Sequence, residues 1–193
     1  HSDQTEGAQT LTCQERSTAT GAGGRIADAL RLGKHQFRTT SYSLAGKSVW
    51  SRGVQTPSEI VDPRGVKTFE EYERWQSAIA NLTNQQHENV FSEAYVQSFS
   101  EAIQTTEEIS RFLDSAELAT EYPTDTRLKQ SLSQVAKLIK AKKVRQAERD
   151  FFFVAIGDWD MHRDMKNRLN AKFAEMNDAL RDFVAEMRAQ GVW

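Results

Sequence analysis

Apolar side chains recur every three or four residues along several segments of the chain, which is the spacing of an amphipathic α-helix. The pattern predicts a short helix over residues 25–32 and longer helices beginning near residues 69, 91, 128 and 166. The last helix carries an apolar stripe from Leu169 to Met187, and such a stripe is typical of a helix that faces a core. Thr124 or Thr126 could cap the helix near residue 128, and Gly191 is a natural stop for the last one.

Two segments have the composition of β-strands. Residues 151–156 form a continuous apolar run, which fits a strand buried on both faces of a parallel sheet. Residues 37–44 have a composition of moderate β-propensity and predict a second strand. The glycines and prolines in 46–65 predict an irregular connection after it. Helix, buried strand, loop and helix in succession make half of an α/β repeat. We therefore expect a helix-rich α/β fold with an incomplete, mostly parallel sheet.

Composition narrows the class of protein without naming a function. The chain has 193 residues, of which 38% are hydrophobic and 27% charged, and this favours a folded protein over a disordered one. The formal net charge of −2 argues against a dedicated nucleic-acid binder. Because no apolar run reaches about 18 residues, we expect no membrane span. Residues 1–20 are polar and predict a disordered leader.

Charge is unevenly placed along the second half of the chain. Residues 127–149 contain eight basic side chains and one acid, whereas 101–125 contain seven acids and one arginine. Two helices with solvated or mutually pairing faces are the simpler interpretation, because surface ion pairs contribute only about 0–1 kcal/mol each. A basic phosphate-binding surface is the alternative.

The segment 157–164 is the best candidate for chemistry, because it follows the predicted buried strand and precedes a helix. Ligands of open α/β sheets bind beyond the carboxyl ends of the strands. Asp160 and His162 are two residues apart, so both side chains can turn toward one point, and this donor pair suits Zn²⁺, Mn²⁺ or Fe²⁺. Asp158 is a weaker third candidate. The alternative is that Asp158 or Asp164 only caps the helix and that His162 is a surface residue.

Other motifs can be set aside. A calcium-binding EF-hand would require glycine at Arg163 and glutamate at Leu169. A hydrolytic dyad of Asp160 with His162 has no recognisable nucleophile beside it. The glycines at 21–24 complete neither a dinucleotide fingerprint nor a P-loop, so they predict a turn.

Residues 151–162, from Phe151 to His162, resemble the strand and Gly-Gly-Phe/Trp-Asp-Thr-His motif of a sulfatase-like family. This family is known as domain of unknown function fifteen-oh-one, and it belongs to the alkaline-phosphatase-like superfamily. The flanking segments 134–141 and 176–183 also resemble the family, as do 23–30 and 41–46 farther upstream. The resemblance thus covers most of residues 21–193 and is most specific over 150–193.

The resemblance implies an α/β/α sandwich whose relatives hydrolyse phosphate or sulfate esters with metals at the strand ends. It places Asp160 and His162 on the Asp-x-His of the motif as metal ligands. Asp158 and Met161 depart from the motif, adding a carboxylate and removing a hydroxyl, so we expect local hydrogen bonding that differs from that of the family. The family's first strand and its later segments have no counterpart here, so residues 21–193 resemble the middle of the domain. Within this part, we expect residues 69–120 to form a helical insertion and residues 127–193 to form a core of helix, strand, loop and helix.

Two functional hypotheses follow. In the first, the protein is a metal-dependent hydrolase of a small anionic phosphate or sulfate ester, although no nucleophile and few metal ligands are visible in this chain. In the second, the same fold serves a non-catalytic binding or assembly role with a protein partner. The resemblance implies export of bacterial members, which the polar first residues do not test.

Overall fold

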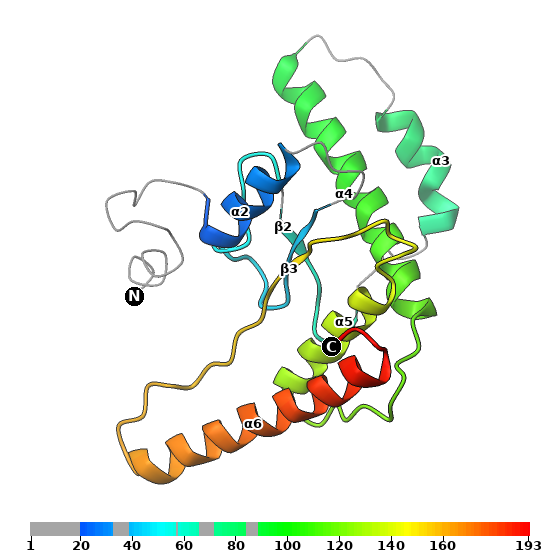
Figure 1. The fold of residues 1–193 in the computed structure, drawn as a ribbon. Coiled ribbons are helices and arrows are strands. Elements are labelled where there is room, and N and C mark those ends of the chain that lie inside the picture. The colour runs from blue at the N-terminus through cyan, green and yellow to red at the C-terminus, as the bar shows by residue number, and fades with distance from the viewer. Residues whose placement is uncertain (1–19, 33–38, 57, 66–71, 84–88) are drawn as a thin grey trace. The chain divides into compact units, whose positions relative to one another are not determined.

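A computed structural model of the chain describes residues 20–32, 39–56, 58–65, 72–83 and 89–193. The predicted leader over 1–20 therefore lies, except for residue 20, outside the described residues. The chain divides into two compact units, one formed by 1–64 with 116–193 and the other by 65–115. The described elements, shown in Figure 1, are α2 (Ala22–Arg31), β1 (Ser41–Ser43), β2 (Ser58–Ile60), α3 (Tyr72–Thr83), α4 (Val90–Ser115), α5 (Arg127–Lys140), β3 (Phe151–Phe153) and α6 (Met165–Ala189).

The first unit is built on a small parallel sheet with the strand order β2-β1-β3. In its register Ser41 is the partner of both Ser58 and Phe151, and Tyr42 lies beside Phe152. The rings of Tyr42 and Phe152 stack with their centroids 5.4 Å apart. The prediction of an α/β fold with an incomplete parallel sheet is confirmed for the described residues.

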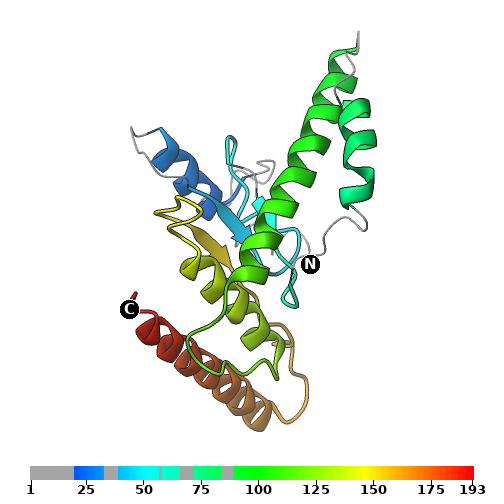
Figure 2. The ribbon, with the colours of Figure 1, turned by 90° about the vertical axis from the view of Figure 1, so that its right-hand side faces the viewer.

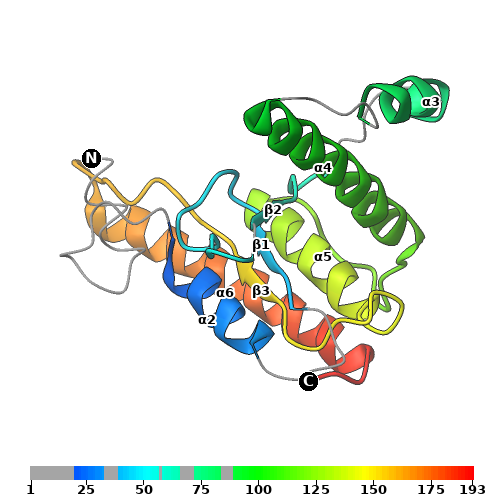
Figure 3. The same cartoon turned by 90° about the horizontal axis from the view of Figure 1, so that it is seen from above.

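Helices lie on both faces of this sheet. Figure 3 shows α2 on one side of the strands and α5 on the other, and α2 contacts both β1 and β3. The side chains of Leu132, Val135 and Leu138 on α5 are buried. Because each face of the sheet is covered, the central strand β1 is buried along its whole length.

The helices α5 and α6 pack side by side (Figure 1 and Figure 2). The predicted cap is present, since the Thr126 Oγ1 accepts a hydrogen bond from the Lys129 amide at 3.2 Å. Lys129 Nζ lies 3.1 Å from Asp182 Oδ2 and 3.2 Å from Asp125 Oδ1, so it joins α5 to α6 and to the residues before α5. Gly191 has a φ of 70°, as a helix stop requires.

The carboxylate of Glu186 ties the segment before α5 to α6. It is fully buried and accepts hydrogen bonds from the Ala119 and Thr120 amides, both at 2.8 Å, and from Thr120 Oγ1 at 2.6 Å. Gln190 Nε2 donates a further bond at 2.6 Å. Burial raises the pKa of Glu186, but these hydrogen bonds outweigh it and leave the pKa below its ordinary value.

The second unit contains α3 and α4, which contact each other. Asn89 begins α4, because its side-chain oxygen accepts the Phe91 amide at 2.9 Å and its carbonyl accepts the Glu93 amide at 3.0 Å. The rings of Tyr95 and Phe99, one helical turn apart, stack at 6.5 Å. The two helices predicted from the apolar rhythm of this region are therefore confirmed.

The strands are shorter than the sequence predicts. Within 39–44 only residues 41–43 pair, and 37–38 lie outside the described residues. The apolar run 151–156 pairs only over 151–153, because its partner β1 ends there. The side chains of β3 are half-buried rather than buried on both faces, because β3 has one neighbouring strand among the described residues. The strand β2 lies within the segment predicted to be irregular.

The glycine-rich segment is a helix and not the predicted turn. Gly23 and Gly24 belong to the first turn of α2. A Cβ atom on Gly23 would lie 2.5 Å from the Trp50 ring, and one on Gly24 would lie 2.0 Å from the Arg52 backbone. The missing side chains therefore permit close packing of the helix on the loop that follows β1.

The apolar stripe of α6 is only partly core-facing, which corrects the prediction. Ala179 and Met187 are buried, whereas Phe173 is 53% exposed and Leu180 is 51% exposed. The reason is that α5 is the main helix that α6 packs against within the described part of the chain, and α5 covers only one side of a stripe this broad.

Candidate functional site

The segment between β3 and α6 leaves the carboxyl end of the sheet and leads to the first turn of α6 (Figure 1). Asp160 and His162 lie on this segment, as the sequence predicts. The strand β3 that precedes them runs parallel to β1, and the Leu44 amide donates to the Phe153 carbonyl at 2.8 Å. The loop is therefore anchored to the sheet up to residue 153.

The structure brings the two candidate ligands together. Asp160 Oδ1 lies 3.0 Å from His162 Nε2, and the two side chains are 87% and 82% exposed. A transition-metal ion binds nitrogen and oxygen donors at about 2.0–2.2 Å, so two neighbouring donors lie about 3.0 Å apart at an octahedral angle and about 3.4 Å apart at the tetrahedral angle of zinc. The observed separation thus fits two neighbouring ligands of one cation, and it also fits a surface ion pair.

The weaker candidate, Asp158, is directed elsewhere. Its Oδ2 lies 3.7 Å from the Lys172 Nζ of α6, and its backbone has a φ of 64°. Within the ranges that the structure describes, no group of three or more His, Cys, Asp or Glu side chains is placed to hold a metal ion. In this structure Asp158 thus lies beside Lys172, apart from the contact between Asp160 and His162.

Two apolar anchors hold the loop on either side of Asp160. Met161 is 7% exposed, and the Trp159 Nε1 donates to the Ile156 carbonyl at 2.8 Å. The Trp159 ring lies 6.0 Å from that of Phe173 on α6. The contact between their side chains places Asp160 and His162 on the same side of the loop, and both are exposed to solvent.

The start of α6 differs from the capping arrangement that the sequence left open. Asp164 occupies the cap position, but its φ of 50° and ψ of 40° are left-handed and its side chain caps no helix amide. Its Oδ1 instead accepts the Asn167 side chain at 2.8 Å. A left-handed backbone turns the carboxylate away from the amides that a cap must reach.

The base of β3 is fixed by a buried charge network. Arg145 donates to the Asp150 carboxylate at 2.8 Å and to the Leu138 carbonyl at 2.9 Å, and it also donates to the Tyr42 hydroxyl. Its guanidinium lies 5.1 Å from the centre of the Tyr42 ring. Burial raises the pKa of Tyr42 to about 12 although the Arg145 charge opposes it, so this hydroxyl stays protonated. The network links the end of α5 to β1 and to β3.

Part of the basic run therefore pairs with acids from other segments. Lys129 contacts Asp125 and Asp182, and Arg145 contacts Asp150. These contacts match the interpretation in which the charged faces pair with each other.

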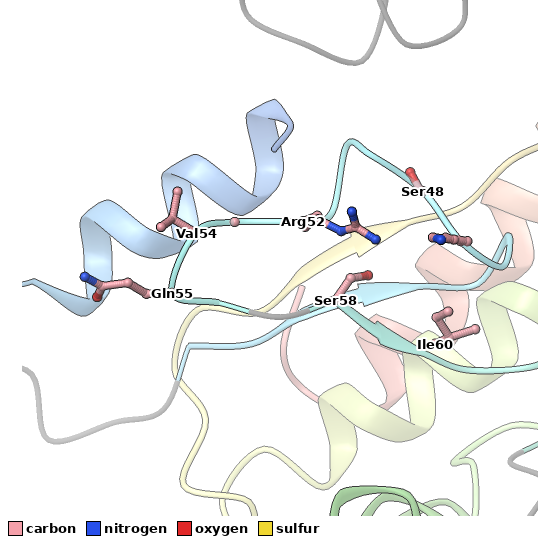
Figure 4. A pocket seen from close by; sticks show the side chains of 8 residues that line it. Ser48, Arg52, Val54, Gln55, Ser58 and Ile60 are labelled. Atoms are coloured by element: carbon pink, nitrogen blue, oxygen red, sulfur yellow. The ribbon is translucent and has the colours of Figure 1, made fainter. Parts of the chain in front are cut away.

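Sequence reasoning missed a pocket of about 430 Å³ beside β2 (Figure 4). Its residues come from the segment that was predicted to be irregular, where two cations stand five residues apart without a recognisable motif. The sequence spacing of Lys47 and Arg52 does not predict a shared site, because the fold of the loop is what brings both side chains to one pocket.

The fold and the loop define an α/β protein with a parallel sheet and a carboxylate-imidazole pair beyond a strand end. The sequence matches a family described as a protein of unknown function (DUF1501) over residues 7–193, and the chain belongs to this family. Searches of curated proteins and of solved structures found no match. Among the described residues, no helix has the length and apolar character needed to cross a membrane.

Proposed function

We propose that the protein is a metal-dependent hydrolase of phosphate or sulfate esters in which Asp160 and His162 are metal ligands. The observation that carries the proposal is the 3.0 Å separation of Asp160 Oδ1 and His162 Nε2 on the segment beyond a parallel strand. The resemblance of residues 150–193 to sulfatase-like domains supports the ester class. Zn²⁺, Mn²⁺ and Fe²⁺ all accept this donor set.

The chain's own contribution is to hold two donors in a fixed relation. Met161 and Trp159 anchor the loop, and the Arg145 network holds β3 at its base. A bound metal would act as a Lewis acid toward an ester oxygen. The remaining ligands and a nucleophile would come from outside the described residues.

The proposal predicts that the intact protein binds about one transition-metal ion through this pair. We expect the double variant Asp160→Asn/His162→Ala to lose this stoichiometric binding, because both donors are removed while the apolar anchors of the loop remain. Metal content after dialysis against Zn²⁺ or Mn²⁺ measures the effect. Asp178→Asn is the matched control, because Asp178 is a half-exposed carboxylate on α6 that pairs with Arg181. Unchanged metal content in the double variant would contradict the proposal.

A second candidate function is non-catalytic binding or assembly on the same fold. It is favoured by the exposed apolar side chains of Phe173 and Leu180 on α6 and by the exposure of both candidate ligands. Hydrolysis of an aryl phosphate or an aryl sulfate by the purified protein, abolished by a chelator, would exclude this candidate.

A further inference from the structure

A second candidate site lies between the loop after β1 and the edge strand β2. The pocket there has a volume of about 430 Å³, within the usual range of small-molecule sites of about 300–1,000 Å³. Among the residues that the structure describes, no aspartate or glutamate lines it. The lining residues are Lys47, Ser48, Arg52, Gly53, Val54, Gln55, Ser58 and Ile60.

The charged side chains that line the pocket are basic. Lys47 and Arg52 are the cations of its lining, and neither side chain forms an ion pair within the part of the chain that the structure describes. Figure 4 shows the Arg52 side chain extending from the loop into the space above Ser58 and Ile60. Glu59 stands between those two residues, so strand alternation directs its side chain to the opposite face.

The loop that carries Arg52 is held in place before any ligand arrives. The Asp28 carboxylate on α2 accepts the amides of Val54 at 2.6 Å, Gln55 at 3.1 Å and Thr56 at 2.7 Å. The Arg52 carbonyl in turn accepts the Gly21 amide at 2.9 Å. The Asp28 carboxylate thus fixes the loop through its backbone amides, and Asp28 itself is not among the residues that line the pocket.

The floor of the pocket is fixed as well. Ser58 Oγ lies 2.6 Å from Ser51 Oγ, and Ser51 Oγ also donates to the Ser48 carbonyl at 3.2 Å. These bonds join the middle of the loop to the first residue of β2. With this floor in place, the Arg52 guanidinium and the Lys47 ammonium line the same space from the loop, and two cations suit the several oxygens of a tetrahedral anion.

We propose that this pocket binds an organic phosphate or sulfate, with Arg52 and Lys47 holding the anionic group. Val54 and Ile60, which are 83% and 55% exposed, would contact the carbon skeleton of the ligand. No residue of the loop that carries Asp160 and His162 lines the pocket. The site therefore goes beyond the proposed metal site and does not depend on it.

The experiment is calorimetric titration of the intact protein, in EDTA, with phenyl phosphate, phenyl sulfate and benzoate. We expect phenyl phosphate or phenyl sulfate to bind, and Arg52→Gln to weaken that binding by about ten- to a hundredfold, because a charge-assisted hydrogen bond is lost. Arg52→Lys should recover part of the affinity. The two tetrahedral probes distinguish a phosphate ligand from a sulfate ligand.

Two controls keep the test specific. Arg168→Gln removes an exposed cation of α6 outside the pocket and should leave the affinity unchanged. Asp160→Asn/His162→Ala should also leave it unchanged, so failure of the metal proposal and failure of this one remain distinguishable. Equal affinities of the wild type and Arg52→Gln for the tetrahedral probes would overturn the proposal, and so would an equal loss of affinity in Arg52→Gln and Arg168→Gln. Binding of benzoate more tightly than either tetrahedral probe, or no binding of phenyl phosphate and phenyl sulfate, would also overturn it.

Discussion

At Gly24 the backbone of α2 approaches a neighbouring segment so closely that no side chain fits. A Cβ atom there would lie 2.0 Å from the Arg52 carbonyl carbon and 2.1 Å from the Gly53 nitrogen. These are backbone atoms, so the clash cannot be relieved by a side-chain rotation. Glycine normally weakens a helix interior by about 1 kcal/mol relative to alanine, and here the close contact outweighs that propensity.

We expect Gly24→Ala to destabilise the fold by about 1–3 kcal/mol, because the helix must move off the loop. Urea denaturation measures the change in the free energy of unfolding. Gly157→Ala is the matched control, since an added Cβ at Gly157 meets nothing within 4 Å and should leave the stability nearly unchanged. A Gly24→Ala protein as stable as the wild type would show that the helix and loop adjust freely.

The candidate ligands show how far single residues could be predicted. Asp160 and His162 are two residues apart on a loop, so their proximity follows from local spacing. The direction of Asp158 toward Lys172 does not, because it depends on where α6 lies. The pocket cations were missed for the same reason, since Lys47 and Arg52 line one pocket through the fold of their loop, which hydrogen bonds from other elements, such as those to Asp28 on α2, hold in place.

At the scale of elements, the long helices were predicted closely, β1 and β3 were located but predicted too long, and β2 was not predicted. The helices α5 and α6 begin within one residue of their predicted starts, because their apolar period persists over many turns. Each strand has three paired residues, which is too short to show an alternating pattern. Pairing with β1 decides which residues of 58–60 and 151–156 become strand, and that partner is remote in sequence.

The cap of α5 offers a test at this scale, because the sequence left Thr124 and Thr126 as alternatives. The structure selects Thr126, whose hydroxyl accepts the Lys129 amide. We expect Thr126→Ala to cost about 0.5–2 kcal/mol of stability through the unsatisfied amide. Thr124→Ala is the matched control, because within the described residues the hydrogen bond of Thr124 is accepted by its backbone carbonyl, from the Gln130 side chain, and the substitution keeps that carbonyl. Thermal or urea unfolding that gives the two variants equal losses would refute the assignment.

At the scale of the whole molecule, three carboxylates in the first unit make stability depend on pH. Burial raises the pKa of Asp28, Asp182 and Glu186, but hydrogen bonds from backbone amides and basic or polar side chains lower each of them below its ordinary value. A lowered pKa in the folded state means that the unfolded state binds protons more readily. The stabilising contribution is therefore present above the ordinary values and is lost as the pH falls through the folded ones.

We expect the free energy of unfolding to be constant near neutral pH and to decline below the ordinary pKa values of 4.5 for Glu186 and 3.8 for Asp28 and Asp182. Urea midpoints measured at about pH 7 and about pH 3 test this. Glu186→Gln should be less stable at neutral pH and should lose less on acidification, because its amide cannot be protonated in that range. Parallel pH curves for the variant and the wild type would contradict the role of Glu186.

The parallel pairing of β1 with β3 also bears on how the protein is made. Residues 41–43 leave the ribosome long before residues 151–153. Until β3 has been synthesised, the edge of β1 that pairs with it lacks this partner, and the Tyr42 ring cannot stack on Phe152. Pairing across so large a separation is slow to form and leaves strand edges open to wrong partners meanwhile. A nascent chain with this topology has a long window in which a chaperone that shields β-edges would raise its yield.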